Sequence, residues 1–572
     1  MRQLYYTFRT LLRGRGGNLT KIISLTLGLL VGILLFARVA FELNYDSYYQ
    51  EPENLFLTLR TVVSQGEKKE PVCSNYGKLP AAIRENFPDE VEDATLIDLF
   101  SRSSLYHEGQ EKKDAILATP RSHIFSTLGV KVLSGNVSEL DNMDALFISR
   151  SLAQSLFADA DPIGKTVMIN IDYPLTVRGV FEDIPENAEF RFDGVYSFVT
   201  RANRFRDERG GWRGDISYTC MVRFRHPEDV EKVAARMPDM MKKYIQYNKD
   251  WFEEFSFITP SQFHLQKKES RKIISILSIL GFAILLIAGM NNVLISISSL
   301  PQRAKSVGVH KCSGASTGHM FLWESALLIL VSLLGVIVLL LYFKPEIEDL
   351  SGASLATLFT WRTLWVPALV TIFLFLLIGL LPGKLFSSIP VTQVFHRFTG
   401  YRASWKYPLL FVQFTGVAFI LGLLMIILLQ YNQVMNRSMG YKIDNLVIGW
   451  GPFDSMDKID GILRGLPFIE ASCNSASFIY NGHTRQSFTD INGKRFMGCI
   501  DFIDEHYVPI LGLQILLGRN VHQDGEVLVN EELLRQVGWT DSPIGRKLME
   551  DNYEWGTVVG VVKDYVAQSA YQ

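Results

Sequence analysis

Five apolar runs separate the parts of the chain that can cross a membrane from the parts that cannot. The runs cover residues 22–41, 273–300, 320–342, 364–381 and 407–429. Each is close to the roughly 20 helical residues that a hydrocarbon core about 30 Å thick requires. The pattern predicts an integral membrane protein with five transmembrane helices, and the 48% hydrophobic content agrees with this prediction.

Two long polar segments, residues 43–271 and 432–572, lie outside these runs. Alternating apolar and polar positions at 55–62, 175–181 and 220–224 predict strands, and the periodicity of 230–244 predicts a helix. We therefore expect two mixed α+β domains outside the membrane.

The expected division of the chain follows from these patterns. It comprises a cytoplasmic N-terminus (1–21), a first span (22–41), a first external domain (42–271), a second span (272–300), a cytoplasmic coupling loop (301–319), a third span (320–343), a short external loop (344–363), a fourth span (364–382), a cytoplasmic loop (383–406), a fifth span (407–430) and a second external domain (431–572).

The distribution of charge predicts the orientation. The stretch before the first span has no acidic residue, and the loops after the second and fourth spans are basic, whereas the loop after the third span is acid-rich. Basic loops stay in the cytoplasm. We expect a multi-pass protein of the bacterial inner membrane, with the N-terminus in the cytoplasm and both large domains on the far side.

An internal repeat is the strongest signal within the sequence. Residues 146–183 align without gaps to 527–564 at an offset of 381, with ten of 38 positions identical. The shared positions include the turn residues Pro162 and Gly164, which match Pro543 and Gly545. We interpret the chain as two copies of one unit, of which the second stops early, so that the sequence is either a fragment or naturally shortened.

No motif predicts a catalytic, metal or cofactor site in this chain. Gly164-Lys165-Thr166 resembles the end of a phosphate-binding loop, but Asp159 stands where that motif needs glycine. The histidines lack metal-ligand spacing, and a net charge of −2 gives no reason to expect nucleic acid. Disulfides Cys73–Cys220 and Cys473–Cys499 are compatible with an external location, although free buried thiols are the simpler interpretation.

A few polar residues inside or beside the spans are candidates for packing or function. Asn291 and Asn292 in the second span can hydrogen-bond between helices, or contact a substrate. Glu324 lies about one turn inside the third span, and pairing with a basic residue of the coupling loop or reaching the boundary would offset its cost. Arg38 and Glu42 share one helix face at the outer end of the first span, which suggests anchoring.

The coupling loop and its flanking spans resemble the permeases of the MacB/FtsX-like family. Positive charge alone would explain the loop as a determinant of orientation, but its order of residues follows the family pattern. The matching residues are Asn291, Asn292, Arg303, Lys305, Val307, Gly308, Val309, Lys311, Gly314, Ala315 and Glu324. The sequence departs from the pattern at Ser306 and His310, where the family usually has glutamate and arginine.

The external segment is also similar to the periplasmic core domain of this family, through residues 157–165, 177–180 and 182–187. The resemblance implies a two-repeat, eight-span permease that docks a cytosolic ABC ATPase on Arg303, Lys305, Val307, Gly308, Lys311, Gly314 and Ala315. The ATPase would use the ATP and magnesium, and this chain would bind no cofactor and have no enzymatic activity of its own. A periplasmic adaptor or outer-membrane partner, and the lipid bilayer, are further expected partners.

Several functions stay open at this point. The leading one is mechanical coupling of ATP hydrolysis to export or extraction of an amphiphilic substrate. The alternative is a non-transporting scaffold that regulates an envelope partner, such as a cell-wall hydrolase. A membrane-bound enzyme and a non-functional remnant are weaker alternatives.

Overall fold

The computed structural model describes residues 18–566 of the 572, with gaps at 65, 99–102, 108–112, 170–172, 205–210, 213–217, 248–250, 299–316, 388–405, 450–455, 478, 480–483, 490–494, 540 and 551–552. The chain forms two units, Met1–Ile420 and Leu421–Gln572. Each unit is described below by itself.

The apolar runs form helices of membrane-spanning length. Within the described residues, four helices are long and apolar enough to cross a membrane: Asn18–Leu43, Lys268–Ser296, Leu322–Tyr342 and Leu410–Met435. The fourth expected span lies in α14 (Trp365–Ser387), of which Trp365–Ile378 counts as a shorter apolar helix. The complete helices are α2 (Asn18–Leu43), α9 (Lys268–Ser298), α11 (Thr317–Tyr342) and α16 (Lys406–Met435).

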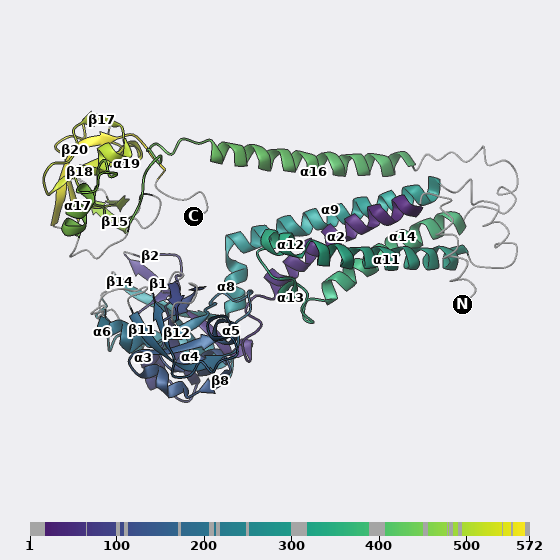
Figure 1. Ribbon diagram of the computed structural model, residues 1–572, viewed down its shortest axis with the longest axis horizontal. Coiled ribbons are helices and arrows are strands. Elements are labelled where there is room, and N and C mark those ends of the chain that lie inside the picture. The colour runs from purple at the N-terminus through teal and green to yellow at the C-terminus, as the bar shows by residue number, and fades with distance from the viewer. Residues whose placement is uncertain are drawn as a thin grey trace. The chain divides into compact units, whose positions relative to one another are not determined.

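Helices α2, α9, α11 and α14 pack side by side through one apolar core (Figure 1). Helix α2 approaches α9 closely at Gly28 and Gly32. A Cβ atom on Gly28 would lie 2.3 Å from the Cβ of Ala288, and one on Gly32 would lie 2.3 Å from Leu285. This glycine pair, four residues apart, is the small-residue spacing that lets transmembrane helices approach one another.

The external domain of the first unit has two sheets with a shared core. The first sheet has the order β14-β1-β13-β3, with β2 on β1 and β4 on β13; the second has the order β6-β5-β10-β11-β9-β12-β7, with β8 on β11. The strands are β1 (Leu55–Ser64), β2 (Glu67–Lys68), β3 (Ser74–Asn75), β4 (Val91–Ile97), β5 (Ser103–Tyr106), β6 (Lys113–Ala115), β7 (Leu117–Ala118), β8 (Val132–Gly135), β9 (Ala145–Ser149), β10 (Thr166–Ile169), β11 (Tyr173–Phe181), β12 (Gly194–Tyr196), β13 (Tyr218–Phe224) and β14 (Trp251–Ile258).

Helices complete the layers of this domain. Leu57 of the first sheet and Phe147 of the second meet in one core with Phe125 of α4. Helices α3 and α7 cover the other face of the first sheet, and α5 packs on the second. The helical segments are η1 (Pro52–Asn54), α3 (Leu79–Asn86), α4 (His123–Leu128), η2 (Val137–Asp141), α5 (Arg150–Phe157), α6 (Phe198–Arg204), α7 (Asp229–Met241) and α8 (Pro260–Gln266). The expected α+β class is confirmed.

The second unit contains one sheet with the order β16-β15-β19-β20-β17, and β18 pairs with β20. Its elements are α17 (Met456–Arg464), β15 (Thr484–Thr489), β16 (Arg495–Ile500), α18 (Tyr507–Leu511), β17 (Ile515–Gly518), β18 (Glu526–Asn530), α19 (Glu531–Val537), β19 (Lys547–Glu550) and β20 (Tyr553–Val562). This order repeats β6-β5-β10-β11 of the first unit, with β8 and β9 in the places of β17 and β18.

The repeat extends to individual hydrogen bonds. Gly164 N–H donates to Val177 O at 2.8 Å, and Gly545 N–H donates to Val558 O at 2.8 Å. Ser149 caps α5 by accepting from Leu152 N–H, as Asn530 caps α19 by accepting from Leu533 N–H. All of these pairs keep the offset of 381, so the structure reproduces the sequence repeat in its turns and caps.

The offset is not constant along the repeat. Leu27-Gly28-Leu29-Leu30 recurs as Leu421-Gly422-Leu423-Leu424, an offset of 394. Two left-handed backbone positions keep this offset: Asp46 (φ 58°) matches Gly440 (φ 82°), and Glu51 (φ 45°) matches Asn445 (φ 60°). The offset of 381 therefore does not apply to the first span, because the first copy carries extra residues between its span and its second sheet.

The four described cysteines, Cys73, Cys220, Cys473 and Cys499, are free thiols. Neither of the two compatible disulfides is formed. Cys220 is 1% exposed in the core of the first sheet, where burial raises the pKa of its thiol to about 12.

Candidate functional site

Four segments of the first unit meet where the membrane helices adjoin the external domain. They are the outer end of α2 with the linker after it, the loop after β11, the junction of α8 with α9, and the connection between α11 and α14. The charged groups gathered there form what we call the ionic joint, which consists of Arg38, Glu42, Asp46, Glu189, His264 and Lys267.

Glu42 is the centre of the joint. Its side chain is 3% exposed and lies 2.7 Å from Arg38 Nη2, one helical turn earlier, and 2.8 Å from His264 Nε2. His264 also lies 3.3 Å from Glu189, a residue of the loop after β11. The His264 ring stacks on the Tyr45 ring, with centroids 3.6 Å apart. One imidazole thereby connects the first span to the external domain and to the base of the second span.

Asp46 and Lys267 close the network. Lys267, directly before α9, forms an ion pair with Glu189. Asp46 is 1% exposed and accepts a hydrogen bond from Glu189 N–H at 2.8 Å through Oδ1. Among the described residues its Oδ2 atom has no hydrogen-bond partner. The Asp46 N–H donates to Asn187 O at 2.8 Å, so the backbone also fastens the linker to the loop.

Burial and neighbouring charge shift the protonation of the joint. Burial raises the pKa of Asp46 to about 7. Burial opposes the charged form of His264, but hydrogen bonds to Glu189 and Glu42 outweigh it and raise the pKa to about 9. Glu189 has a lowered pKa because the bonds from His264 and Lys267 outweigh its burial. At neutral pH the imidazole is therefore protonated and donates from both nitrogens.

The connection between α11 and α14 is bonded to the same region. Ser354 N–H donates to Glu186 Oε2 at 2.7 Å, which ties it to the loop after β11. Arg362 donates to Ser47 O in the linker after α2. The loop after β11 is therefore bonded to the linker after α2, to the residue before α9 and to the connection between α11 and α14.

The residues expected to dock the ATPase, Arg303, Lys305, Val307, Gly308, Lys311, Gly314 and Ala315, lie outside the described residues. Their role stays a prediction. Asn291, Asn292 and Glu324 lie in the membrane bundle, Pro162 and Gly164 lie in a turn of the first unit, and Pro543 and Gly545 lie in the matching turn of the second unit.

The intramembrane polar residues are partly accounted for by helix packing. Asn291 donates to Ser24 Oγ at 2.7 Å, a contact between α9 and α2. Asn292 is fully buried, and its side-chain atoms have no hydrogen-bond partner among the described residues. Glu324 lies 3.7 Å from Lys21 Nζ, so this pair joins α11 to the start of α2. Lys21 supplies a basic partner among the described residues, and the expected pairing with the coupling loop, which lies outside them, stays a prediction.

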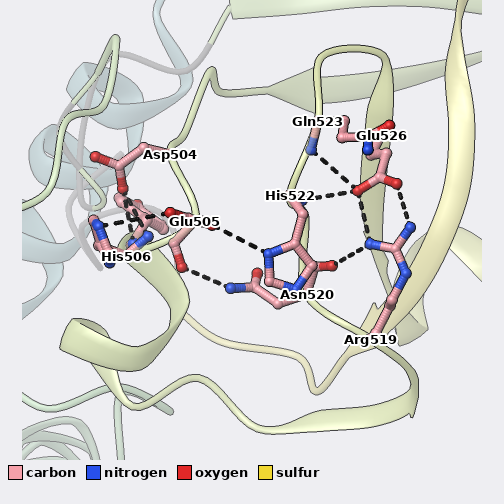
Figure 2. Close-up of polar contacts among 9 residues, drawn as sticks. Asp504, Glu505, His506, Arg519, Asn520, His522, Gln523 and Glu526 are labelled. Carbon is pink, nitrogen blue, oxygen red and sulfur yellow. Dashed lines mark hydrogen bonds and ion pairs between the residues drawn. The ribbon is translucent and has the colours of Figure 1, made fainter.

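A second polar cluster lies on the second unit, between the segment before α18 and the turn that joins β17 to β18. Figure 2 shows His522 Nδ1 beside Glu505, at 3.1 Å, and Arg519 in an ion pair with Glu526. The Arg519 bond lowers the pKa of Glu526 to about 2. Glu505, His522 and Arg519 are at least half exposed, whereas Glu526 is 13% exposed. No described group of three or more metal-ligating side chains is arranged to hold a metal. In the first unit, Ser122 and Asp141 bridge the equivalent segments.

Sequence reasoning missed most of the ionic joint. It found Arg38 and Glu42 by their spacing, but Glu189 and His264 are 75 residues apart and carry no motif. A carboxylate beside the end of a span and an isolated histidine beside the start of the next one are the only local signals.

Comparison with known proteins agrees with this architecture. A model of the MacB-like periplasmic core domain matches residues 21–240, and a model of the FtsX-like permease C-terminal region matches residues 278–391. Together they cover more than half of the chain. No curated protein matches it.

Three solved structures are similar to parts of the chain. A domain described as a permease domain from Porphyromonas gingivalis has 21% identity, a TM-score of 0.32, and covers 37% of this chain and 91% of its own. The periplasmic region of MacB from Actinobacillus actinomycetemcomitans has 17% identity, a TM-score of 0.25, and coverage of 38% and 92%. The extracellular domain of the noncanonic ABC-type transporter YknZ from Gram-positive bacteria has 18% identity, a TM-score of 0.25, and coverage of 35% and 99%.

Fold and site together define a membrane protein in which an external α+β domain is bonded to a bundle of spanning helices. The two family models name the class more closely, since one covers the first span with its domain and the other covers the following spans. The chain belongs to the MacB/FtsX-like permeases, the membrane subunits of ABC transporters.

Proposed function

We propose that this subunit couples ATP hydrolysis by a separate cytosolic ATPase to movement of its external domain, and that the ionic joint transmits the motion. The contact between Glu42 and His264 is the observation that supports the proposal. It is buried, and it links the outer end of α2 to α8, the short helix directly before α9.

Helix α9 gives the joint a mechanical input. It has 31 residues, which corresponds to a rod about 46 Å long. One end lies at Lys267 and His264, and the other leads into the coupling loop at 301–319. Closure of an ATPase beneath that loop would displace α9 and change the contacts of the ionic joint. Packed elements shift between discrete arrangements, so a displacement at one end of the helix is passed to the other.

The work performed by the external domain is, in this proposal, export or extraction of an amphiphilic substrate. The N-terminus and the coupling loop lie in the cytoplasm, and both external domains lie on the opposite side of the inner membrane. A periplasmic adaptor or outer-membrane partner would receive the substrate there.

The test measures binding of the ATPase and transmission of its motion to the external domain as separate quantities. The tagged chain is purified from native membranes, its ATPase is identified by mass spectrometry, and both are reconstituted in nanodiscs. Arg303→Glu with Lys305→Glu should abolish ATPase binding. Glu42→Gln should leave binding intact but remove the ATP-dependent distance change between spin labels on the external domain and on α2.

Matched variants exclude general damage. Arg397→Glu with Arg402→Glu reverses charge in the other basic loop and should not affect ATPase binding. Glu231→Gln removes an exposed carboxylate of α7 and should not affect the distance change. The proposal fails if no ATPase is recovered, or if Glu42→Gln moves as the unaltered chain does.

A further inference from the structure

The connection between α11 and α14 exposes large apolar side chains. It contains α12 (Lys344–Ser351) and α13 (Leu355–Leu358), labelled in Figure 1. Leu350 is 91% exposed and Trp361 is 79% exposed. We call residues 343–364 the elbow. Such exposure within a short polar segment indicates a surface that something covers.

The elbow lies at the level where the spans leave the hydrocarbon. Its buried side packs on the outer end of α2, where Ala353 and Leu358 contact Phe41. Tyr342 ends α11 directly before the elbow, and Trp365 begins α14 directly after it. Tyrosine and tryptophan concentrate at the boundary between lipid and water. The elbow is therefore continuous with the lipid-facing surface of the bundle.

Hydrogen bonds fix the conformation of the elbow. Leu355 N–H donates to Glu348 Oε1 at 2.8 Å, which locks α13 against α12. Ser354 caps α13 by accepting from Thr357 N–H. Lys344 lies 3.9 Å from Glu348, and this pair lies on another side of α12 from Leu350, whereas Glu346 lies one turn before Leu350 on the same side. The exposed apolar residues are thus held outward by a rigid turn.

We propose that the elbow is a lipid-contacting platform, on which Leu350 and Trp361 lie in the headgroup region of the outer leaflet. Bilayer lipid is the partner that covers it. Interfacial helices bury an apolar face about 5–10 Å into this region while their charged side stays in water. The guanidinium of Arg362 lies 5.5 Å from the Trp361 ring centroid, beside the same boundary.

The platform has a consequence for the external domain. Arg362 binds the linker after α2, and Ser354 binds the loop after β11, so the elbow contacts both sides of the ionic joint. The state of the outer leaflet is thereby transmitted to the external domain. This inference rests on the membrane-spanning helices and not on coupling to an ATPase.

The test uses the full chain in phospholipid nanodiscs. Cys73, Cys312, Cys473 and Cys499 are replaced by serine, leaving the buried Cys220, and an environment-sensitive fluorophore is attached at Leu350→Cys or Trp361→Cys. Lipids brominated near the headgroup should quench both labels strongly. The matched control is Met143→Cys, which replaces a residue 56% exposed on the external domain and should show no loss of fluorescence.

Two results would overturn the proposal. One is a label at Leu350 that iodide in the water quenches as readily as the label at Met143, which would place the elbow in solvent. The other is a label protected from both iodide and brominated lipid, which would mean that a protein covers it. Because neither readout involves ATP, failure here is distinct from failure of the coupling proposal.

Discussion

The two copies of the repeat agree in their turns and differ where the span meets the external domain. At the offset of 394, Arg38 and Glu42 of the first copy match Asn432 and Asn436 of the second. The ion pair of the first copy is replaced by a hydrogen bond, since Asn436 donates to Asn432 Oδ1 at 2.6 Å. The same helical spacing is used once with charge and once without it.

Asp46 is a third charged residue of the ionic joint that the second copy lacks. Asp46 has the left-handed backbone that glycine adopts without strain, and the second copy has Gly440 there. The first copy therefore holds a buried carboxylate at a position where the backbone favours glycine. The second copy keeps the helical spacing and the left-handed backbone without these charges. The charges are therefore not needed for the fold, which supports a role for them in the ionic joint.

The largest expected loss of stability is in the first copy, which carries the ion pair between Arg38 and Glu42. Glu42→Ala leaves the half-buried Arg38 without its carboxylate and the buried, protonated His264 with Glu189 alone, which costs about 3 kcal/mol. Asn436→Ala removes an exposed amide and should change stability by about 0.5 kcal/mol or less. Denaturant unfolding in mixed micelles measures both. Equal losses in the two variants would show that charge is not what distinguishes the copies.

The next prediction concerns pH. Asp46 has a pKa of about 7 in the folded protein, so its contribution to stability is complete below about 3.9 and is lost as the pH rises through 7. His264, with a pKa of about 9, adds stability that is complete below about 6.5 and is lost as the pH rises through 9. Glu189, whose pKa is lowered, loses its contribution in acid.

The joint should thus be most stable in mildly acidic solution and weaken toward pH 9. Asp46→Asn keeps the bond to Glu189 N–H and should stabilise the protein at pH 8 by on the order of 3 kcal/mol, but hardly at pH 4. Hydrogen exchange of the backbone amides in residues 260–267, corrected for the intrinsic exchange rate, reports local opening of the ionic joint. A gain of the same size at both pH values would contradict the shifted pKa.

A smaller effect is expected within the bundle. Gly28→Leu forces a side chain into the contact between α2 and Ala288 of α9, and overpacking costs about 1–3 kcal/mol. A Cβ atom on its aligned partner Gly422 would meet no described atom of the second unit within 4 Å, so Gly422→Leu should be neutral or slightly stabilising. Thermal unfolding in detergent compares the two. A loss at Gly422 as large as that at Gly28 would contradict the close α2–α9 packing as the cause.

The sequence predicted the classes of element better than it predicted the joint. Apolar runs specify spans because the bilayer requires about 20 apolar residues, and the Pro-Gly turns recur because a left-handed position selects glycine. Glu189 and His264 could not be paired in advance, since only the folding of the external domain onto α8 brings them together. The varying offset was also hidden, because insertions leave no periodic signal.

The smallest prediction tests what the copies share. Gly164 and Gly545 have φ of 80° and 84°, with open space around both, so alanine meets backbone strain and no steric contact. Gly164→Ala and Gly545→Ala should each cost about 1 kcal/mol in denaturant unfolding.

Gly461 of α17 provides a control of opposite sign. It also has open space around it but lies in a helix, where Gly461→Ala should stabilise by about 0.5–1 kcal/mol. Equal losses at Gly164 and Gly545 mean that the two turns are one structure used twice. A loss in only one copy would mean that the shared residues have diverged in energy, and the difference between the copies would then extend beyond the joint.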